Sequence, residues 1–298
     1  MDKVLVLLST YNGALYLEEQ LISLVSQKGV SVSILVRDDG STDGTRAILE
    51  KWQSQGKLKW YTGDNIGPAH SFLDLIYRAE EIDYYAFCDQ DDVWMENKLK
   101  VAIEKMNSIG ADLYYSSYST TDNSLKILAE SVQKPVINTL AQALVYASVT
   151  GCTMVFTQQL AKVVKRYMPS KLMMHDSWLF KIALALEHKI YYDKQSYILY
   201  RQHGNNVIGD HKSWYARWKG RMIRIMKSDR KRYDEMKELY EGYNDIMPAD
   251  QLQSIIPLLD YYKRHIWYRI RVAFNKKYVT GVTHSDNLFK IAILLKKF

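Results

Sequence analysis

The sequence predicts an α/β protein in which a mostly parallel sheet is flanked by helices and followed by a helical extension. Three observations indicate this class. Strand-like and helix-like segments alternate four times within about the first hundred residues, which is typical of βαβ units. Each strand-like run is apolar and ends in polar or glycine residues. From about residue 212 onward the chain is helical in pattern, basic and rich in aromatic side chains.

The four strand and helix pairs follow one another closely along the chain. Each strand-like run is short, and the segment after it places apolar side chains at helical spacing. With the strand given first, the expected pairs are residues 3–13 with 14–27, 32–44 with 45–55, 58–67 with 68–81, and 83–92 with 93–106. Ligands of such sheets bind beyond the carboxyl ends of the strands, so we expect the polar clusters there to meet in one crevice.

The second half of the chain has a mixed pattern. Residues 112–119 and 151–156 are strand-like, 157–168 and 176–187 are helix-like, and 189–203 suggests two short strands. The uncharged segment 135–161 is long enough to span a bilayer, but its many Asn, Gln, Ser and Thr side chains predict a helix followed by a buried strand. We place the boundary between a sheet-containing domain and a basic helical region so that they cover residues 1–210 and 211–298.

Charge and cysteine content narrow the surroundings of the protein. Residues 1–211 carry a net charge of −3 and residues 212–298 a net charge of +10, so the two parts are expected to meet different partners. Cys88 and Cys152 are too few for a disulfide framework and are not spaced like metal ligands, which fits a reducing compartment. The apolar run at the start is shorter than a signal peptide requires. We therefore expect a cytoplasmic protein.

Acidic side chains gather at the ends of two predicted strands. Asp89, Asp91 and Asp92 follow one apolar run, and Asp38 and Asp39 end another. A solvated turn that caps the next helix would explain three acids, but carboxylates this close repel and hold one another's protons. A bound Mg²⁺ or Mn²⁺ removes the repulsion, and Mg²⁺ is usually held by one or two carboxylates together with substrate phosphates. The pattern predicts a metal site that binds a diphosphate.

Several motifs together resemble those of the family 2 glycosyltransferases, which have the GT-A fold. Within residues 3–110 they are, in order, STYNGALYLEEQLISLVSQ, VRDDGSTDGT, NIGPAHSF and CDQDDVWMENKL. Looser matches follow in GCTMVF, HDSW and YRQHGNNVIG, and the last is similar to the bacterial rhamnosyltransferase branch. Independent motifs in family order are hard to obtain by chance. The resemblance implies a Rossmann-like, mostly parallel sheet flanked by helices, with a C-terminal α-helical extension.

The resemblance also implies roles for individual residues. Contacts to the nucleotide and the donor sugar are expected from Thr10, Tyr11, Asn12, Asp38, Asp39, Asn65, Asp89 and Arg201. Asp39 is the candidate for reading the pyrimidine base. Asp91 is the expected metal ligand, with Asp89 near the ribose or the metal and His203 as a further candidate ligand. Asp92 is expected to orient its neighbours or to cap the next helix.

Sugar transfer needs a base that takes the proton from the attacking hydroxyl group. Family members carry an acid at a helix start for this purpose, and the HDSW motif makes Asp176 the candidate; on local sequence alone it would be a helix cap. His175 is either an acceptor contact or a solvated turn residue. The implied enzyme is an inverting, metal-dependent transferase that moves rhamnose from dTDP-rhamnose to a hydroxyl group of a cell-envelope polysaccharide or a protein-linked glycan.

Other functions remain open at this stage. A UDP-hexose transferase of the same fold and a non-catalytic nucleotide-sugar-binding module share the same motifs. VRDDGST faintly resembles haloacid-dehalogenase phosphatases, but those space the two acids differently. No specific nucleic-acid motif accompanies the basic tail.

The basic tail itself has three readings. Its aromatic side chains, such as Trp214, Trp218, Trp267 and Phe274, fit a helical core, self-association into a homo-oligomer, or peripheral attachment to the anionic inner face of the cell membrane. The sequence does not choose among them.

Overall fold

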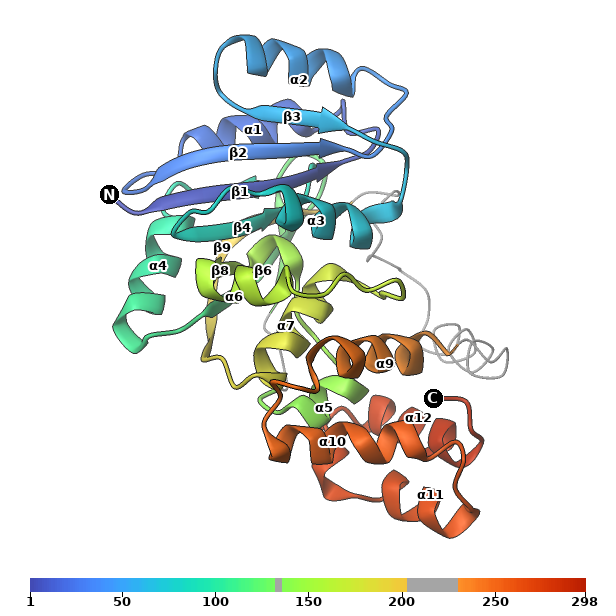
Figure 1. The fold of residues 1–298 in the computed structure, drawn as a ribbon. Coiled ribbons are helices and arrows are strands. Elements are labelled where there is room, and N and C mark those ends of the chain that lie inside the picture. Colours follow the sequence, from blue (N-terminus) through green and yellow to red (C-terminus); the bar gives the residue numbers. More distant parts are fainter. Residues whose placement is uncertain (132–135, 203–229) are drawn as a thin grey trace.

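The computed structural model describes residues 1–131, 136–202 and 230–298, and Figure 1 shows their arrangement. The first part of the chain alternates strands and helices as predicted. Its elements are β1 (Lys3–Thr10), α1 (Leu17–Val25), β2 (Ser31–Asp38), α2 (Thr45–Ser54), β3 (Lys59–Thr62), α3 (Gly67–Arg78), β4 (Tyr84–Cys88), β5 (Val93–Trp94) and α4 (Lys98–Ile109).

The later elements mix strands with helices and end in a group of helices alone. They are β6 (Leu113–Thr121), β7 (Ile127–Ser131), α5 (Leu140–Val145), the 3₁₀ turn η1 (Gly151–Thr153), β8 (Val155–Thr157), α6 (Gln158–Val164), α7 (His175–Ala185), β9 (Ile190–Arg201), α9 (Lys231–Tyr243), α10 (Ala249–Asp260), α11 (Ile266–Ala273), the 3₁₀ turn η2 (Lys276–Tyr278) and α12 (Thr283–Leu294).

One twisted sheet joins all of the described strands. Its order is β3-β2-β1-β4-β8-β6-β9-β5, with β7 paired to β6. The strands β3, β2, β1 and β4 are parallel, whereas β8 runs antiparallel to both of its neighbours. In the parallel half, Thr10 lies opposite Asp38, and Asp38 lies opposite Thr62. The carboxyl ends of these strands are therefore level with one another and form one edge.

The sheet is covered by helices on both faces, which explains why its strands are almost continuously apolar. Val4, Val6 and Leu8 of β1 belong to a core under α1, α2 and α4, while Leu5 and Leu7 face a second core under α3, α6 and α7. This alternation follows from the two-residue period of a strand. The predicted α/β class with a C-terminal helical extension is confirmed.

The C-terminal helices share the second core with the sheet. In Figure 1 they lie below the sheet, with α9 beside α7. The Tyr243 ring of α9 is fully buried, its centre is 6.2 Å from the Trp178 ring centre, and its hydroxyl group donates to the Val164 carbonyl oxygen at 3.3 Å. The boundary between residues 210 and 211 lies outside the described residues, and it stays a prediction.

Three details depart from or refine the sequence expectation. Residues 189–203 were expected to form two strands, but Ile190–Arg201 is one strand. Its pairing with β6 shifts by two residues between Asp193 and Ser196, so the polar residues that suggested a break form a bulge. The segment expected to be wholly helical at 93–106 begins with β5, whereas 135–161 contains the predicted helix and buried strand.

No helix among the described residues combines the length and the apolar character needed to cross a bilayer.

Candidate active site

The ends of β1 and β4 are tied together by one side chain. Gln90, the residue between Asp89 and Asp91, accepts hydrogen bonds from the Thr10 hydroxyl group at 2.6 Å and from the Tyr11 N–H at 2.8 Å. Its amide nitrogen donates to the Tyr11 carbonyl oxygen at 3.2 Å. The acidic loop is thus held against the first strand, where the sequence predicted a nucleotide contact.

The turn after β1 is joined to the loop after β2. The Asn12 N–H donates to the Ser41 hydroxyl oxygen at 2.9 Å, and the Asn12 side-chain oxygen accepts from the Thr42 N–H at 2.9 Å. Asn12 has a positive φ of 49°, which asparagine tolerates better than most residues. Asn12 therefore connects the two loops, while Tyr11 beside it is 46% exposed and available to a ligand.

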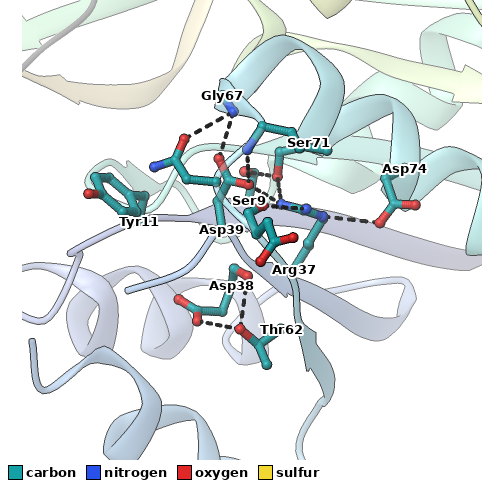
Figure 2. Close-up of polar contacts among 12 residues, drawn as sticks. Ser9, Tyr11, Arg37, Asp38, Asp39, Thr62, Gly67, Ser71 and Asp74 are labelled. Carbon is teal, nitrogen blue, oxygen red and sulfur yellow. Dashed lines mark hydrogen bonds and ion pairs between the residues drawn. The ribbon is translucent and has the colours of Figure 1, made fainter. Parts of the chain in front are cut away.

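Asp38 and Asp39 point to opposite sides of the chain, as Figure 2 shows. Asp38 is fully buried and accepts hydrogen bonds from Arg46 at 2.8 Å, Thr62 at 2.9 Å and the Ser41 N–H at 3.2 Å. Burial by itself would raise the pKa of Asp38, but the hydrogen bonds outweigh it and keep the pKa below the ordinary value. Asp38 therefore holds the loop after β2 in place, and its predicted contact with the nucleotide stays a prediction.

Asp39 is held at the start of α3. Its oxygens accept from the Ile66 N–H at 3.0 Å and the Gly67 N–H at 2.9 Å, and it forms a buried ion pair with Arg37. Asn65, the other predicted contact here, accepts from the same Gly67 N–H at 3.2 Å, so Asp39 and Asn65 are neighbours. Arg37 also bonds to Asp74 at 3.0 Å (Figure 2), and it is a site residue that the sequence analysis missed.

The three acids after β4 differ in exposure. Asp89 and Asp91 are partly exposed, whereas Asp92 is fully buried. Burial and the negative charges of Asp91 and Asp176 raise the pKa of Asp89 to about 7. Asp176, which is far away in the sequence, is thus close enough to act electrostatically on the acidic loop. The geometry agrees, because Gly151 bonds to Asp176 and the next residue, Cys152, lies beside Asp89 and Asp92.

Asp92 lies beneath the loop beside a thiol. Ligand atoms of Asp89, Asp92 and Cys152 lie within 4.8 Å of one another. One Asp92 oxygen accepts from the Arg201 N–H at 3.3 Å, and the other has no hydrogen-bond partner in the described part of the chain. Burial and the charges of Asp91 and Asp89 raise the pKa of Asp92 well above its ordinary value. Lys98 is buried with its Nζ 3.5 Å from the Trp94 ring centre, and burial lowers its pKa to about 8 although the charges of Cys152, Cys88 and Asp92 oppose this shift.

Arg201 binds the backbone of the acidic loop that follows β4. Its guanidinium group donates to the Asp91 carbonyl oxygen at 3.0 Å, to the Asn123 carbonyl oxygen and to the Glu19 carboxylate. It also lies 4.6 Å from the Tyr16 ring centre and is only 2% exposed. Arg201 therefore fixes the backbone of Asp91, and its predicted contact with the donor stays a prediction.

Asp176 lies in the first turn of α7 and points toward η1. One oxygen accepts from the Gly151 N–H at 3.1 Å and the other from the Ser177 N–H at 2.6 Å. Burial raises the pKa of Asp176 to about 6, although both N–H groups favour the charged form. A side chain at position 151 would not fit, because a Cβ there would lie 2.5 Å from His175 Nε2.

His175 belongs to the core and is not a solvated turn residue. Its ring stacks on Phe72 at 3.9 Å and contacts the edge of Phe87 at 4.7 Å. Burial lowers the pKa of His175 to about 3, so the ring is neutral. The packing of His175 therefore fixes the start of α7 and, with it, the position of the neighbouring Asp176.

Helix α9 fixes the loop that leads into α7. Glu235 forms a buried ion pair with Lys181 of α7 and accepts from the Met173 N–H at 3.0 Å. One turn later, Glu238 accepts from the Tyr167 hydroxyl group at 2.6 Å and from the Lys171 N–H at 3.0 Å. The C-terminal helices thus hold the candidate base in position. Neither glutamate could be predicted, because nothing in the sequence pairs them with α7 or the loop before it.

The donor atoms at the acidic loop fit a hard divalent cation. Asp89 and Asp91 offer partly exposed carboxylates, and carboxylate oxygens suit Mg²⁺ and Mn²⁺, whereas the buried Cys152 thiol is a soft ligand. Burial and the charges of Asp91 and Asp176 raise the pKa of Asp89, and a cation held there would lower it. The predicted ligand His203 lies outside the described residues.

Comparison with known proteins identifies the family. Residues 5–167 match glycosyl transferase family 2, which is more than half of the chain. The chain belongs to this family. A curated relative, the dTDP-rhamnosyl transferase RfbG of Shigella flexneri, is 32% identical over 229 residues, covering 71% of this chain and 77% of the relative. The protein is therefore a glycosyltransferase, as its motifs predicted.

Solved structures support the fold. S. aureus TarS, in a complex with UDP-GlcNAc, superposes with a TM-score of 0.58 at 19% identity. The match covers 98% of this chain and 90% of the TarS chain. The mannosyltransferase PcManGT of Pyrobaculum calidifontis, in a complex with GDP-Man and Mn²⁺, has a TM-score of 0.53 at 16% identity, with 99% and 87% covered. The predicted GT-A fold is confirmed.

The raised pKa of Asp89 predicts that Mn²⁺ binding depends on pH. A carboxylate must lose its proton to bind a metal ion, so affinity should fall about tenfold from about pH 8 to about pH 6. Isothermal titration calorimetry of the whole protein measures this directly. Asp89→Asn should bind weakly at both pH values, and Asp250→Asn, a change at an exposed acid of α10, should behave like the unchanged protein. Equal affinity at both pH values in the unchanged protein would contradict the assignment.

Proposed function

We propose that this glycosyltransferase is inverting and metal-dependent, and that it moves rhamnose from dTDP-rhamnose to a hydroxyl group of a cell-envelope polysaccharide or a protein-linked glycan. The observation that carries the proposal is the pairing of two carboxyl sets across one site. The turn η1 links the two sets: the Gly151 N–H donates to Asp176 at 3.1 Å, and the Cys152 thiol beside it lies within 4.8 Å of carboxylate oxygens of Asp89 and Asp92. The relative RfbG, a dTDP-rhamnosyl transferase, supports the choice of donor.

The chain's own residues suit the two halves of the reaction. Asp176, held by the Gly151 N–H and the Ser177 N–H, takes the proton of the acceptor hydroxyl group while that oxygen bonds to the anomeric carbon. The bond between the anomeric carbon and the diphosphate oxygen breaks at the same time, so the configuration inverts and the nucleoside diphosphate leaves with the electron pair.

Binding and orientation of the donor belong to the opposite wall. A cation held by Asp91 and Asp89 would supply positive charge to the leaving diphosphate. Tyr11 is exposed beside the loop, Gln90 keeps that loop on β1, and Arg201 supports it from behind. The buried environment makes each of these charges more effective than it would be in water.

Assay of a donor panel tests the class and the sugar together. With Mn²⁺ or Mg²⁺, we expect hydrolysis of dTDP-rhamnose to exceed that of UDP-glucose, UDP-galactose and UDP-GlcNAc. Asp91→Ala should lose nearly all activity because the ligand for the cation is gone. Preference for a UDP-sugar would replace rhamnose but keep the enzyme class. Nucleotide binding without turnover of any donor would instead indicate a binding module.

Replacement of Asp176 tests the base. Asp176→Asn keeps an oxygen for the Gly151 N–H but cannot accept a proton, so the turnover number for transfer should fall about 10²- to 10⁴-fold. Donor affinity, measured by calorimetry, should change little. With Mn²⁺ kept saturating, so that Asp89 does not limit the rate, the rate of the unchanged protein should rise with pH through about 6, because Asp176 is protonated below that pH. Retention of most of the activity by Asp176→Asn would exclude this role.

The pair Glu235 and Lys181 should tune the same base. Burial is the main cause of the raised pKa of Asp176, and Glu235 adds to it while Lys181 opposes it. Glu235→Gln should therefore shift the acidic limb of the rate profile to lower pH. It should also destabilise the protein by about 3–5 kcal/mol, since it leaves Lys181 buried without its partner.

Glu238→Gln is the matched control for this effect. Glu238 lies one turn further along α9 and is also buried, but it binds the loop before α7 and is not among the main causes of the Asp176 shift. The control should lose stability in thermal unfolding and keep the original pH profile. Identical profiles for the two variants would show that Glu235 is merely structural.

A further inference from the structure

The far end of the C-terminal helices carries an exposed apolar stripe. On α11, Trp267 is 73% exposed, and Phe274 just after it is 61% exposed. Trp267, Arg271 and Phe274 are spaced by four and three residues, so they lie on the same side of the helix. Val272, on the other side, is buried in the core. Helix α11 therefore has two apolar sides, one of which the protein leaves open to its surroundings.

Burial distinguishes the aromatic side chains of the basic tail that pack in the core from those that are exposed. Tyr278 and Phe289 are buried and account for the core-packing reading. Trp267 and Phe274 do not belong to the core. Ile266, next to Trp267, is also 42% exposed, which extends the stripe. Single exposed apolar residues are ordinary, but a contiguous group on one helix indicates an interaction site.

Positive charge surrounds this stripe. Residues 261–285 contain six Lys and Arg side chains and no Asp or Glu, and one of the six, Arg264, is paired at 3.1 Å with Asp260 at the end of α10. The next acid along the chain, Asp286, is buried and accepts hydrogen bonds from Thr280 at 2.6 and 2.9 Å, so it does not offset the charge at the surface. Lys290 of α12 lies 5.4 Å from the Phe274 ring centre. Lys296 lies 5.2 Å from the ring centre of Tyr262, which is also exposed.

Charge and shape together select the occupant. A second copy docked by the same surface would bring Arg271 and its basic neighbours against their own counterparts, which disfavours a symmetric pair. An anionic bilayer presents negative charge to the Lys and Arg side chains and an apolar boundary to Trp267 and Phe274. Amphipathic aromatic rings are at home at that boundary, and basic side chains add attraction to anionic lipids.

We propose that α11, with the adjoining ends of α10 and α12, is the surface by which this protein docks on the headgroup region of an anionic membrane. The inference rests on the proposed function only in that it would bring the site to a lipid-linked acceptor. The docking itself does not depend on which sugar is transferred. Basic side chains should set the dependence on lipid charge, and the two exposed aromatic rings should set the depth of contact.

Vesicle co-sedimentation of the full chain tests the surface. We expect binding to vesicles of phosphatidylcholine mixed with phosphatidylglycerol, little binding to phosphatidylcholine alone, and release by added salt. The double variant Trp267→Ser and Phe274→Ser should bind at least about tenfold more weakly. Arg271→Gln and Lys277→Gln should each weaken binding about fivefold.

A matched control separates this surface from exposed apolar groups in general. Ile127 and Leu128 of β7 are 54% and 57% exposed, and Ile127→Ser with Leu128→Ser should leave vesicle binding unchanged. Donor hydrolysis and the thermal unfolding midpoint of the Trp267 and Phe274 variant should match those of the unchanged protein, which shows that the variant is folded. These readouts also keep a failure of docking distinct from a failure of the proposed function.

Two results would overturn the proposal. The first is that the unchanged protein does not bind the vesicles, or that the Trp267 and Phe274 variant binds them as tightly as the unchanged protein does. The other is a dimer in analytical ultracentrifugation that this variant dissociates while vesicles capture neither protein, which would assign the stripe to a second copy.

Discussion

Carboxyl groups with raised pKa values, of which Asp92 and Asp176 are buried, are the constraint on which the rest of the site depends. Asp89, Asp92 and Asp176 each have a raised pKa because burial disfavours the charged form, and the negative charges around Asp89 add to the effect. Such groups are unfavourable to keep in an empty protein. They become favourable when a cation or a transferred proton compensates them, which is why such groups are candidates for a functional site.

The surrounding structure keeps these acids in place with neutral donors and distant ion pairs. Backbone N–H groups of Gly151 and Arg201 bind Asp176 and Asp92 without neutralising them. The cationic side chains bind neighbouring groups instead. Arg201 donates to the Asp91 carbonyl oxygen, and Lys181 pairs with Glu235. These contacts hold the loop at several points, and those to Asp92 and Asp176 come from uncharged N–H groups. Because Glu235 comes from α9, the C-terminal helices are part of this arrangement as well as of the second core.

The fold and the rough location of the site could be predicted because both depend on local pattern. Apolar runs ending in Thr10, Asp38 and Asp89 predicted parallel strands, and parallel strands align their carboxyl ends. Side-chain direction could not be predicted in the same way. Asp38 and Asp39 are adjacent, yet one is committed to the loop beneath the site and the other to the start of α3.

Contacts between distant segments could not be predicted from the sequence either. Gln90 meets Thr10 across neighbouring strands, and Glu235 meets Lys181 across two helices that the sequence separates widely. Arg201 matched a motif, but its surroundings direct it to the back of the metal loop. The sequence of β9 suggested two short strands because the extra residues of a bulge interrupt the strand pattern in the same way as a turn.

The central claim is that the strand-end acids hold a cation that joins them to the donor diphosphate, opposite Asp176. Anomalous X-ray diffraction from crystals grown with Mn²⁺ and dTDP tests it most directly. The account predicts a manganese peak at roughly 2 Å from carboxylate oxygens of Asp91 or Asp89, bridged to the diphosphate and facing Asp176. A nucleotide bound at this edge of the sheet without manganese, or manganese bound away from these acids, would contradict it.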